Sequence, residues 1–251
     1  MDRSSLAAEV NRYSWYHTLD LGDGVVTSGV FDHRPVLARY PVPADLSGLR
    51  CLDVGTMDGF WAFEMERRGA AEVVAIDLED PERLDWPRSL RATNEKTMDI
   101  EKPLRFELAR DALGSNVERV LRSVYELDDD LGTFDFVFCG DLLLHLKDPI
   151  TAVENLYRVC RGSATVCTTI TRYRWGRRRA LADFDGIDEF QWWTLSQAAL
   201  ERMMRAAGFA RVEGAKPFEV PPTAGGPWRG LRGAARGYVE GASGASQSSA
   251  G

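Results

Sequence analysis

The sequence predicts an α/β protein with a mostly parallel sheet that carries helices on both faces. Short apolar segments typical of buried strands alternate along the chain with longer segments of helical periodicity. Alternation of this kind builds βαβ units, which place their strands in parallel and bury both faces of the sheet. The chain has 251 residues, which is enough for one sizeable domain with short additions.

The expected elements are separated by turn residues. Buried strands are expected at 50–55, 73–76, 134–139 and 164–170, with a weaker strand at 117–124 and a late strand at 209–212. Helices are expected at 60–68, 104–113, 149–161 and 195–207. Gly69, Gly162 and Gly208 each directly follow one of these helices, as is typical of a helix end.

Composition divides the chain into three parts. Residues 1–48 are expected to form an N-terminal arm and lid, with an amphipathic helix or loose arm at 1–14 and a hairpin or lid at 15–34. Residues 49–220 hold the alternating strands and helices. Residues 221–251 are rich in Gly, Ala and Ser, which predicts a tail whose end is disordered.

Composition also excludes several classes of protein. With 44% hydrophobic and 27% charged residues, the chain is not collagen-like or mostly disordered, and no apolar run approaches the roughly 18 residues of a membrane span. The net charge of −7 disfavours a general attraction to nucleic acid, although a local basic patch could still bind it. No secretory signal is expected, and the four cysteines are expected to be buried thiols of a cytoplasmic protein rather than a zinc site or disulfides.

Residues 52–60 carry the strongest functional signal. A strand leads into a glycine bend at Gly55 and Gly59, and a helix follows, so a ligand can approach the backbone and the free N–H groups of the helix start. Asp77 closes the next strand, 24 residues after Asp53. A carboxylate at that place can accept both hydroxyls of a ribose.

Two classes of cofactor use this layout. A dinucleotide site needs G-x-G-x-x-G, but Met57 stands where the middle glycine would approach the pyrophosphate. Asp53 and Asp58 suit a pyrophosphate poorly, and they suit the cationic amino-acid end of S-adenosylmethionine (SAM) well. SAM is therefore the favoured cofactor, with a dinucleotide or a loop without a ligand as the alternatives.

The glycine segment resembles the D/E-x-G-x-G-x-G motif of class I SAM-dependent methyltransferases, whose sheet is Rossmann-like. Residues 53–59 match this motif except at the middle glycine. More narrowly, residues 15–213 resemble the tRNA wobble-uridine carboxymethyltransferase family and its small relatives. The segments that carry this narrower resemblance are Gly140-Asp141-Leu142-Leu143-Leu144-His145, Asp148-Pro149 and Trp192-Trp193.

The resemblance implies which residues bind SAM. The glycine bend and Asp53 would hold the methionine part, Asp77 the ribose, and the residues after the weak strand the adenine, although no carboxylate matches the adenine-contacting acid common in the superfamily. The complete set expected to bind the cofactor is Asp53, Gly55, Thr56, Asp58, Gly59, Asp77, Leu78, Ser123, Val124 and Gly140. Leu144 stands where the carboxymethyltransferases carry a Tyr that helps select a carboxylated SAM, and their N-terminal region with a cofactor-contacting lysine is not expected here. Both departures favour ordinary SAM as the methyl donor and weaken the assignment of tRNA as the substrate.

Three residues are candidates for catalysis. His145 lies beside the expected methyl group and could act as general base or contact the substrate, or simply bond a backbone carbonyl. His17 lies next to Trp15 and Tyr16 in the expected lid. Asp141 could orient His145, contact the substrate or cap the following helix.

The residues expected to bind the substrate are Tyr16, Arg174 and Trp192. Arg174 lies in the dense basic run 172–179, which could grip phosphate, bind an acidic small molecule or start a solvated helix. Trp192 could wall an aromatic or sugar substrate, or could be buried for packing. No metal site is expected.

These observations together predict a SAM-dependent methyltransferase that acts on an oxygen or nitrogen nucleophile of a small molecule. A tRNA-modifying (carboxy)methyltransferase and a non-catalytic SAM-binding module are the alternatives. No membrane partner is expected, and the identity of the methyl acceptor and the oligomeric state stay open.

Overall fold

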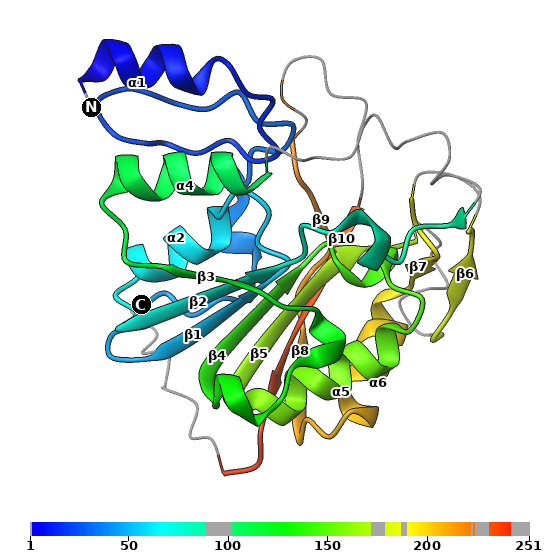
Figure 1. Ribbon diagram of the computed structural model, residues 1–251. Helices are drawn as coiled ribbons and strands as arrows, with labels where there is room; N and C mark the ends of the chain where they lie inside the picture. Colours follow the sequence, from blue (N-terminus) through cyan, green and yellow to red (C-terminus); the bar gives the residue numbers. More distant parts are fainter. Residues whose placement is uncertain are drawn as a thin grey trace.

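The computed structural model describes residues 2–88, 102–171, 179–186, 190–221, 223 and 231–241. These residues form an eight-stranded central sheet with the strand order β3-β2-β1-β4-β5-β10-β8, and β9 pairs with β10 at the side (Figure 1). The strands of this sheet are β1 (Arg50–Val54), β2 (Glu72–Asp77), β3 (Glu118–Leu121), β4 (Phe134–Gly140), β5 (Cys160–Thr169), β8 (Arg211–Gly214), β9 (Phe218–Glu219) and β10 (Leu231–Tyr238). A second, two-stranded sheet pairs β6 (Ala182–Phe184) with β7 (Trp193–Leu195).

Strands β1 to β5 run in parallel, and β10 is antiparallel to its neighbours β5, β8 and β9. The strand order reverses between β1 and β4. In a sheet of this kind a ligand binds beyond the carboxyl ends of the strands at this reversal. A ligand site is therefore expected at the carboxyl ends of β1, β2 and β4.

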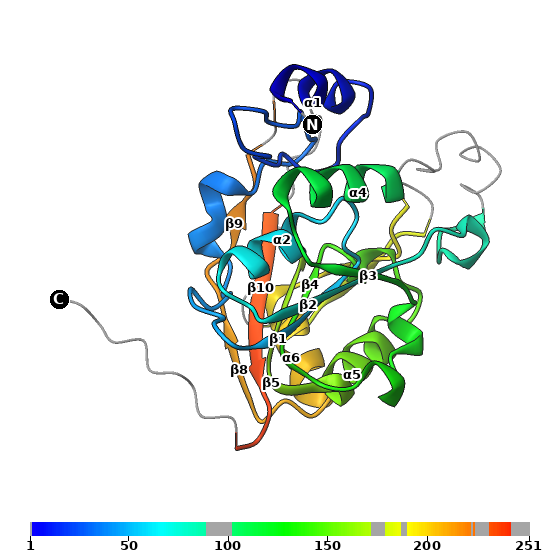
Figure 2. The same ribbon diagram turned by 60° about the vertical axis from the view of Figure 1, so that its left-hand side comes forward.

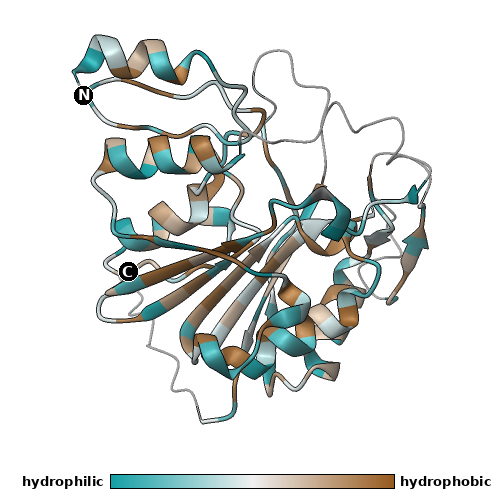
Figure 3. Cartoon of the chain, viewed as in Figure 1, coloured by the Kyte–Doolittle hydropathy of each residue, from teal (hydrophilic) through white to brown (hydrophobic). Residues whose placement is uncertain are grey.

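Helices cover both faces of the sheet, as the sequence predicted. The described helices are α1 (Arg3–Val10), α2 (Phe60–Arg67), α4 (Lys102–Leu113), α5 (Pro149–Val159) and α6 (Gln197–Ala206). Side chains alternate along each strand, so Cys51 and Phe136 join the core beneath α2 and α4, whereas Leu52 and Val137 join the core beneath α5 and α6. The hydrophobic colouring of the central strands reflects this burial on both faces (Figure 3). None of the described helices is long and apolar enough to span a bilayer.

The N-terminal segment packs against the α2 and α4 side of the sheet. Helix α1 begins at a side-chain cap, where Asp2 accepts a hydrogen bond from the Ser5 amide, and α1 lies beside α4 in both views (Figure 2). Trp15 is buried and donates from Nε1 to the carbonyl of Val10. The expected hairpin at 15–34 is limited to the isolated bridges His17–Phe31 and Asp20–Val26. Its role as a lid stays a prediction.

The expected end of the 149–161 helix is wrong by two residues. Helix α5 ends at Val159, and Gly162 lies inside β5 instead of capping the helix. A Cβ atom at Gly162 would lie 2.2 Å from the carbonyl oxygen of Asp135 in the neighbouring strand β4. Glycine is therefore needed here because the two strands approach each other closely. In the sequence, a glycine of this kind cannot be distinguished from one that ends a helix.

The expected tail at 221–251 is also wrong, because β10 is an interior strand between β5 and β8. Its Gly- and Ala-rich composition reflects tight packing: a Cβ at Gly237 would lie 2.6 Å from the ring of Phe209, and one at Gly233 would lie 2.5 Å from Gln197 Oε1. Small residues let α6 and its neighbours approach the strand closely. The segment 241–251 is expected to be disordered, and all of it except Gly241 lies outside the described residues.

Candidate functional site

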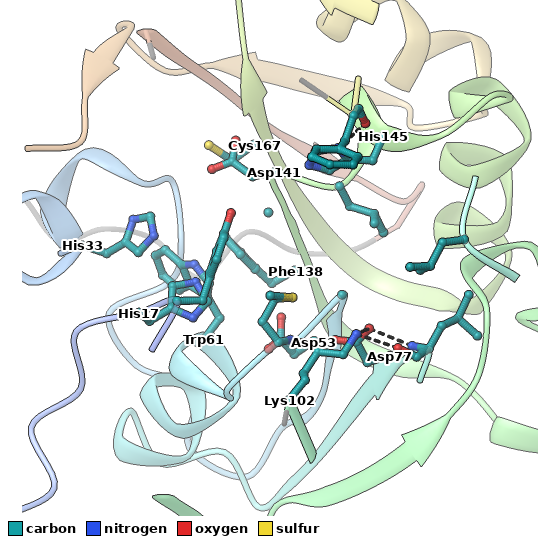
Figure 4. Close-up of a pocket in the computed structure, with 18 of the residues that line it drawn as sticks. His17, His33, Asp53, Trp61, Asp77, Lys102, Phe138, Asp141, His145 and Cys167 are labelled. Atoms are coloured by element: carbon teal, nitrogen blue, oxygen red, sulfur yellow. Dashed lines mark hydrogen bonds and ion pairs between the residues drawn. The ribbon is translucent and has the colours of Figure 1, made fainter. Parts of the chain in front are cut away.

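A cavity of about 370 Å³ lies at the carboxyl ends of β1, β2 and β4 and is closed on one side by the N-terminal segment. Nine of the residues expected at the site line it: Tyr16, His17, Asp53, Gly55, Asp77, Leu78, Gly140, Asp141 and His145. Figure 4 shows Asp53, Asp77 and Lys102 at one end of this cavity and Asp141, Cys167 and His145 at the other. The parallel sheet thus brings together strand ends that are far apart in the sequence.

The chain turns sharply after β1. Gly55 has a φ of +79°, and the amides of Gly55 and Thr56 both donate to the carbonyl of Ile76 in β2. Met57 has a φ of +53° and so retains the left-handed backbone of a glycine motif although its side chain lines the cavity. Gly59, with a φ of +93°, packs so closely that a Cβ would lie 2.3 Å from the ring of Phe63. Thr56 and Gly59 therefore shape the bend without lining the cavity.

Asp53 offers an unused carboxylate oxygen at this bend. The residue is 2% exposed, and within the described part of the chain its Oδ2 atom has no hydrogen-bond partner. Burial raises the pKa of Asp53 to about 7, although the Thr56 hydroxyl and His17 act in the opposite direction. A buried carboxylate of this kind is suited to a cationic ligand group such as an ammonium.

Asp77 is held by three donors at the end of β2. Its Oδ1 accepts from the Leu78 amide at 2.7 Å and from Lys102 Nζ at 2.6 Å, and its Oδ2 accepts from the Met57 amide at 2.8 Å. Lys102 also donates to the carbonyl of Leu78 at 2.6 Å. A carboxylate has about four acceptor positions, so one remains on Oδ2 for a ribose hydroxyl. Sequence reasoning missed Lys102, since nothing in its local pattern distinguishes it from a surface lysine at a helix start.

A smaller cavity of about 80 Å³ adjoins the first and shares seven lining residues with it: Gly55, Asp77, Leu78, Leu84, Trp86, Leu142 and His145. Ser123 and Val124 line this second cavity, as expected for residues near an adenine. The Ser123 hydroxyl accepts from the Tyr125 amide and caps a short 3-10 helix, η3 (Val124–Glu126). The sequence showed no carboxylate for this place, yet Asp85 lines it and accepts from the Tyr125 hydroxyl at 2.7 Å.

His145 has a defined hydrogen-bond pattern. Its Nδ1 lies 2.8 Å from the carbonyl oxygen of Phe190, and a carbonyl only accepts, so Nδ1 carries the proton. The lone pair of the neutral ring is then on Nε2. Burial lowers the pKa of His145, although the Phe190 carbonyl and Asp141 act to raise it. The neutral imidazole at neutral pH can accept a proton from a ligand.

Asp141 is bound by an arginine that the sequence placed in the tail. Arg232 of β10 is 5% exposed, and its Nε donates to Asp141 Oδ2 at 2.7 Å. Asp141 Oδ1 is buried and has no partner among the described residues. The φ of Asp141 is +48°, an uncommon value for a residue other than glycine. The hydrogen bond of Asp141 goes to Arg232 and not to His145, which it was expected to orient.

Asp58 anchors the N-terminal segment, and its expected role in binding the cofactor is not supported. Its Oδ2 accepts from the amides of Tyr16 and His17 at 2.9 Å each, and its Oδ1 binds His17 Nδ1. Asp58 is fully buried and does not line the described cavity. All three histidines of the chain line that cavity, because His33 joins His17 and His145 there.

Among the expected substrate residues, only Tyr16 is found at the described cavity. Trp192 does not line it; its Nε1 donates to the carbonyl of Asp85 and its amide to the carbonyl of Leu144, so it holds loops together. Arg174 lies outside the described residues. Sequence reasoning missed the aromatic walls Trp61, Trp86, Phe138 and Phe190, whose composition resembles that of an ordinary core. No cluster of three or more potential metal ligands occurs in the described ranges.

Residues 30–213 match a family model described as a methyltransferase domain. The chain belongs to this methyltransferase domain family. The match covers the strands β1 to β7, most of β8 and the bend that carries Gly55. Of the described residues that line the cavity, all except Tyr16 and His17 therefore lie within the methyltransferase domain.

Curated relatives of this methyltransferase domain include two kinds by name, tRNA U34 carboxymethyltransferases and ubiquinone biosynthesis O-methyltransferases. A tRNA U34 carboxymethyltransferase of Stutzerimonas stutzeri is 30% identical over 178 residues, which cover 70% of this chain and 49% of the relative. A ubiquinone biosynthesis O-methyltransferase of Neisseria meningitidis serogroup C is 35% identical over 111 residues, which cover 44% of this chain and 39% of the relative. The chain therefore spans less than half of the length of either relative.

Solved structures share the fold of the methyltransferase domain. The N-terminal domain of EvdMO1 with SAH bound has a TM-score of 0.62 at 18% identity, and the match covers 95% of this chain and 98% of that one. The [4+2]-cyclase SpnF has a TM-score of 0.55 at 15% identity, with 94% and 93% covered. At these identities the likeness shows the fold alone.

Proposed function

We propose that the chain binds SAM and transfers its methyl group to an oxygen or nitrogen of a small molecule. One observation carries this proposal: a single cavity joins the bend at Gly55, with the unused oxygen of Asp53, to His145, whose Nε2 is left to accept a proton. A cofactor site and a base on facing walls of one cavity are what methyl transfer to an O–H or N–H group requires.

The residues present fit the parts of SAM. Asp53 Oδ2 suits the ammonium of the methionine part, and the remaining acceptor position of Asp77 together with Lys102 suits the ribose hydroxyls. The adjoining small cavity at Ser123 and Val124 suits the adenine. When bound, SAM supplies an electrophilic methyl carbon on a sulfonium.

His145 would act as the general base. SAM would supply the methyl group, and its sulfur would keep the electron pair of the carbon–sulfur bond. The Nε2 atom of His145 would accept the proton that the acceptor oxygen or nitrogen loses on methylation. Asp141 would stabilise the resulting imidazolium. The bond from Nδ1 to the Phe190 carbonyl keeps Nε2 free for this step.

Calorimetry with SAM and with S-adenosylhomocysteine tests the cofactor. A dissociation constant at or below about 100 µM supports the proposal, since useful cofactor affinities lie in this range. The absence of binding at that concentration would contradict the proposal that the chain binds SAM. Binding of SAM without turnover on any acceptor would favour the non-catalytic module instead.

The base is tested with His145→Gln. We expect kcat to fall by roughly 10²-fold, with the SAM dissociation constant within about twofold of the parent value, because His145 acts on the acceptor proton. Since burial lowers the pKa of His145, the acid limb of the parent pH–kcat profile should lie below 6.5 and should be absent from the variant. An unchanged kcat and pH profile would show that another group takes the proton.

A tRNA substrate is the second candidate, favoured by the 30% identity to a tRNA U34 carboxymethyltransferase. It predicts transfer of label from SAM to total tRNA. The basic run then supplies phosphate contacts, so tRNA binding should weaken as salt rises and when Arg177, Arg178 and Arg179 are neutralised. Label in tRNA that responds in this way would replace the small-molecule proposal.

A further inference from the structure

The end of the cavity around Asp141 and His145 carries information about the methyl acceptor. We infer that the acceptor is an uncharged or cationic ring compound with two O–H or N–H groups, one bound by Asp141 and the other methylated. This inference rests on the proposed methyl transfer and specifies the acceptor for the same site.

The first observation is the hydrogen-bonding character of this end. Asp141 Oδ1 is buried without a described partner, and a carboxylate oxygen can only accept. His145 Nε2 is also an acceptor, because Nδ1 donates to the Phe190 carbonyl. Asp141 and His145 line the same end of the cavity (Figure 4). A ligand that satisfies both acceptors must present two donors.

Arg232 makes Asp141 a fixed acceptor. The guanidinium holds Oδ2 at 2.7 Å and lies 5.6 Å from the ring centre of Phe31, so the carboxylate cannot rotate to satisfy Oδ1 elsewhere without losing this pair. Asp141 also donates its amide to the carbonyl of Cys167 at 2.8 Å. An unsatisfied buried acceptor is costly to a folded chain, and a ligand donor removes that cost.

The second observation is the charge of the lining. Among the described residues, the cavity is lined by four carboxylates, namely Asp53, Asp77, Glu79 and Asp141, and by one lysine, Lys102. Lys102 is bound to Asp77 at the cofactor end, and Arg232 does not line the cavity. Among the described residues, a carboxylate or phosphate on the acceptor would meet Asp141 without a cation on the cavity wall to offset it. We expect such an acceptor to be disfavoured by about 10²-fold.

The third observation is the shape of the walls. Trp61 and Phe138 stack with ring centres 4.1 Å apart, and Tyr40 lies edge-on to Trp61 at 4.5 Å. Trp86 and Phe190 lie 4.7 Å apart on another part of the wall. All five side chains line the cavity. Flat aromatic walls favour a planar ring or the apolar face of a sugar.

The test uses the full chain with methyl-labelled SAM and a metabolite extract of the source cells, separated on an anion exchanger at neutral pH. Label should appear in products from the unretained fraction, which holds neutral and cationic compounds. Label in products from the retained fraction, which holds carboxylates, phosphates and nucleic acids, would overturn the inference but leave methyl transfer intact. No label in either fraction would count against the proposed function itself.

The labelled product should still contain the second donor. Its mass in D2O should exceed its mass in H2O by at least one exchangeable hydrogen, and a product without any exchangeable hydrogen would overturn the inference. Asp141→Asn removes the charge and keeps the size of the side chain. We expect it to raise the acceptor KM about 10-fold, with SAM affinity within about twofold, and to admit anionic acceptors.

Asp111→Asn is the matched control, because it makes the same chemical change at a side chain that is 75% exposed on α4. Melting temperatures of both variants separate a local effect from unfolding. If Asp141→Asn keeps the parent KM and the parent exclusion of anionic acceptors, Asp141 does not contact the substrate.

Discussion

At the scale of single residues, the cofactor end of the cavity holds two carboxylates in different surroundings. Asp53 lies in β1 with a pKa raised to about 7 by burial, whereas Asp77 is held by two amides and Lys102. The two carboxylates therefore differ in their hydrogen-bond partners, because Asp53 Oδ2 has none among the described residues. Each can therefore be tested separately with the same ligand.

Binding of SAM should weaken as the pH falls below about 7. The free protein then carries a proton on Asp53, and that proton must leave before the carboxylate can bind a cationic ammonium. Calorimetry between about pH 5.5 and 7.5 should show the affinity falling by roughly tenfold for each unit below the pKa. Asp53→Asn should bind more weakly at neutral pH and lose this dependence. A parent protein with constant affinity over the range would show that Asp53 does not meet the ammonium.

Asp77→Ala should weaken SAM binding by roughly 1–3 kcal/mol, because the ribose loses charged hydrogen bonds. Lys102 loses its partner in the same variant, so the melting temperature must be measured beside the affinity. Lys102→Met provides the control in which the carboxylate remains. Unchanged SAM affinity in Asp77→Ala would mean that the ribose is held elsewhere.

At the scale of elements, the contact between the N-terminal segment and α2 depends on one buried carboxylate. Asp58 precedes the cap residue Gly59 and accepts two amides and one imidazole nitrogen from Tyr16 and His17. The hydrogen bonds place Tyr16 and His17 on the wall of the cavity. The wall and the start of α2 are thus built by the same contact.

Asp58→Ala should loosen this segment. Two buried amides lose their acceptor, and the free energy of unfolding should fall by about 2–4 kcal/mol. Limited proteolysis should then cut within residues 2–40 faster than in the parent protein, and Asp111→Ala on exposed α4 serves as control. Equal cleavage rates in Asp58→Ala and the parent would show that other contacts hold the segment.

At the scale of the whole molecule, the central sheet depends on β10, a strand in the segment whose composition suggested a tail. β10 pairs with β5 over Arg232–Tyr238 and with β8 over Ala235–Tyr238, so it joins two parts of the sheet. Ala234 and Ala235 are fully buried, one in each of the two cores. The fold is therefore incomplete without the last part of the chain.

A chain that ends at Gly230 should fail to fold, because it leaves the edges of β5 and β8 unpaired and both cores open. A chain that ends at Gly241 keeps β10 and should melt within about 2 °C of the full chain. Thermal unfolding followed by circular dichroism distinguishes the two. A cooperative transition in the shorter chain would contradict the assigned role of β10.

The sequence alone determined the succession of the main strands and helices along the chain and several side chains at both ends of the site. These features depend on local rules: apolar strands end in turn residues, Ser196 caps α6, and Gly55 and Gly59 permit a bend that other residues resist. Asp53, Asp77, Asp141 and His145 were predictable because each lies at or just after the end of a strand, and parallel strands end at one edge of the sheet.

Only the tertiary structure decided which side chains meet across the sheet. Arg232 lies 91 residues from Asp141, and Lys102 lies 25 residues from Asp77, so no local pattern links the partners. The small residues of β10 resemble a flexible tail in composition, but their size is set by α6 and Phe209 packed against them. Contacts of this kind follow from strand order and packing distance, which are properties of the folded chain and are absent from any short segment of it.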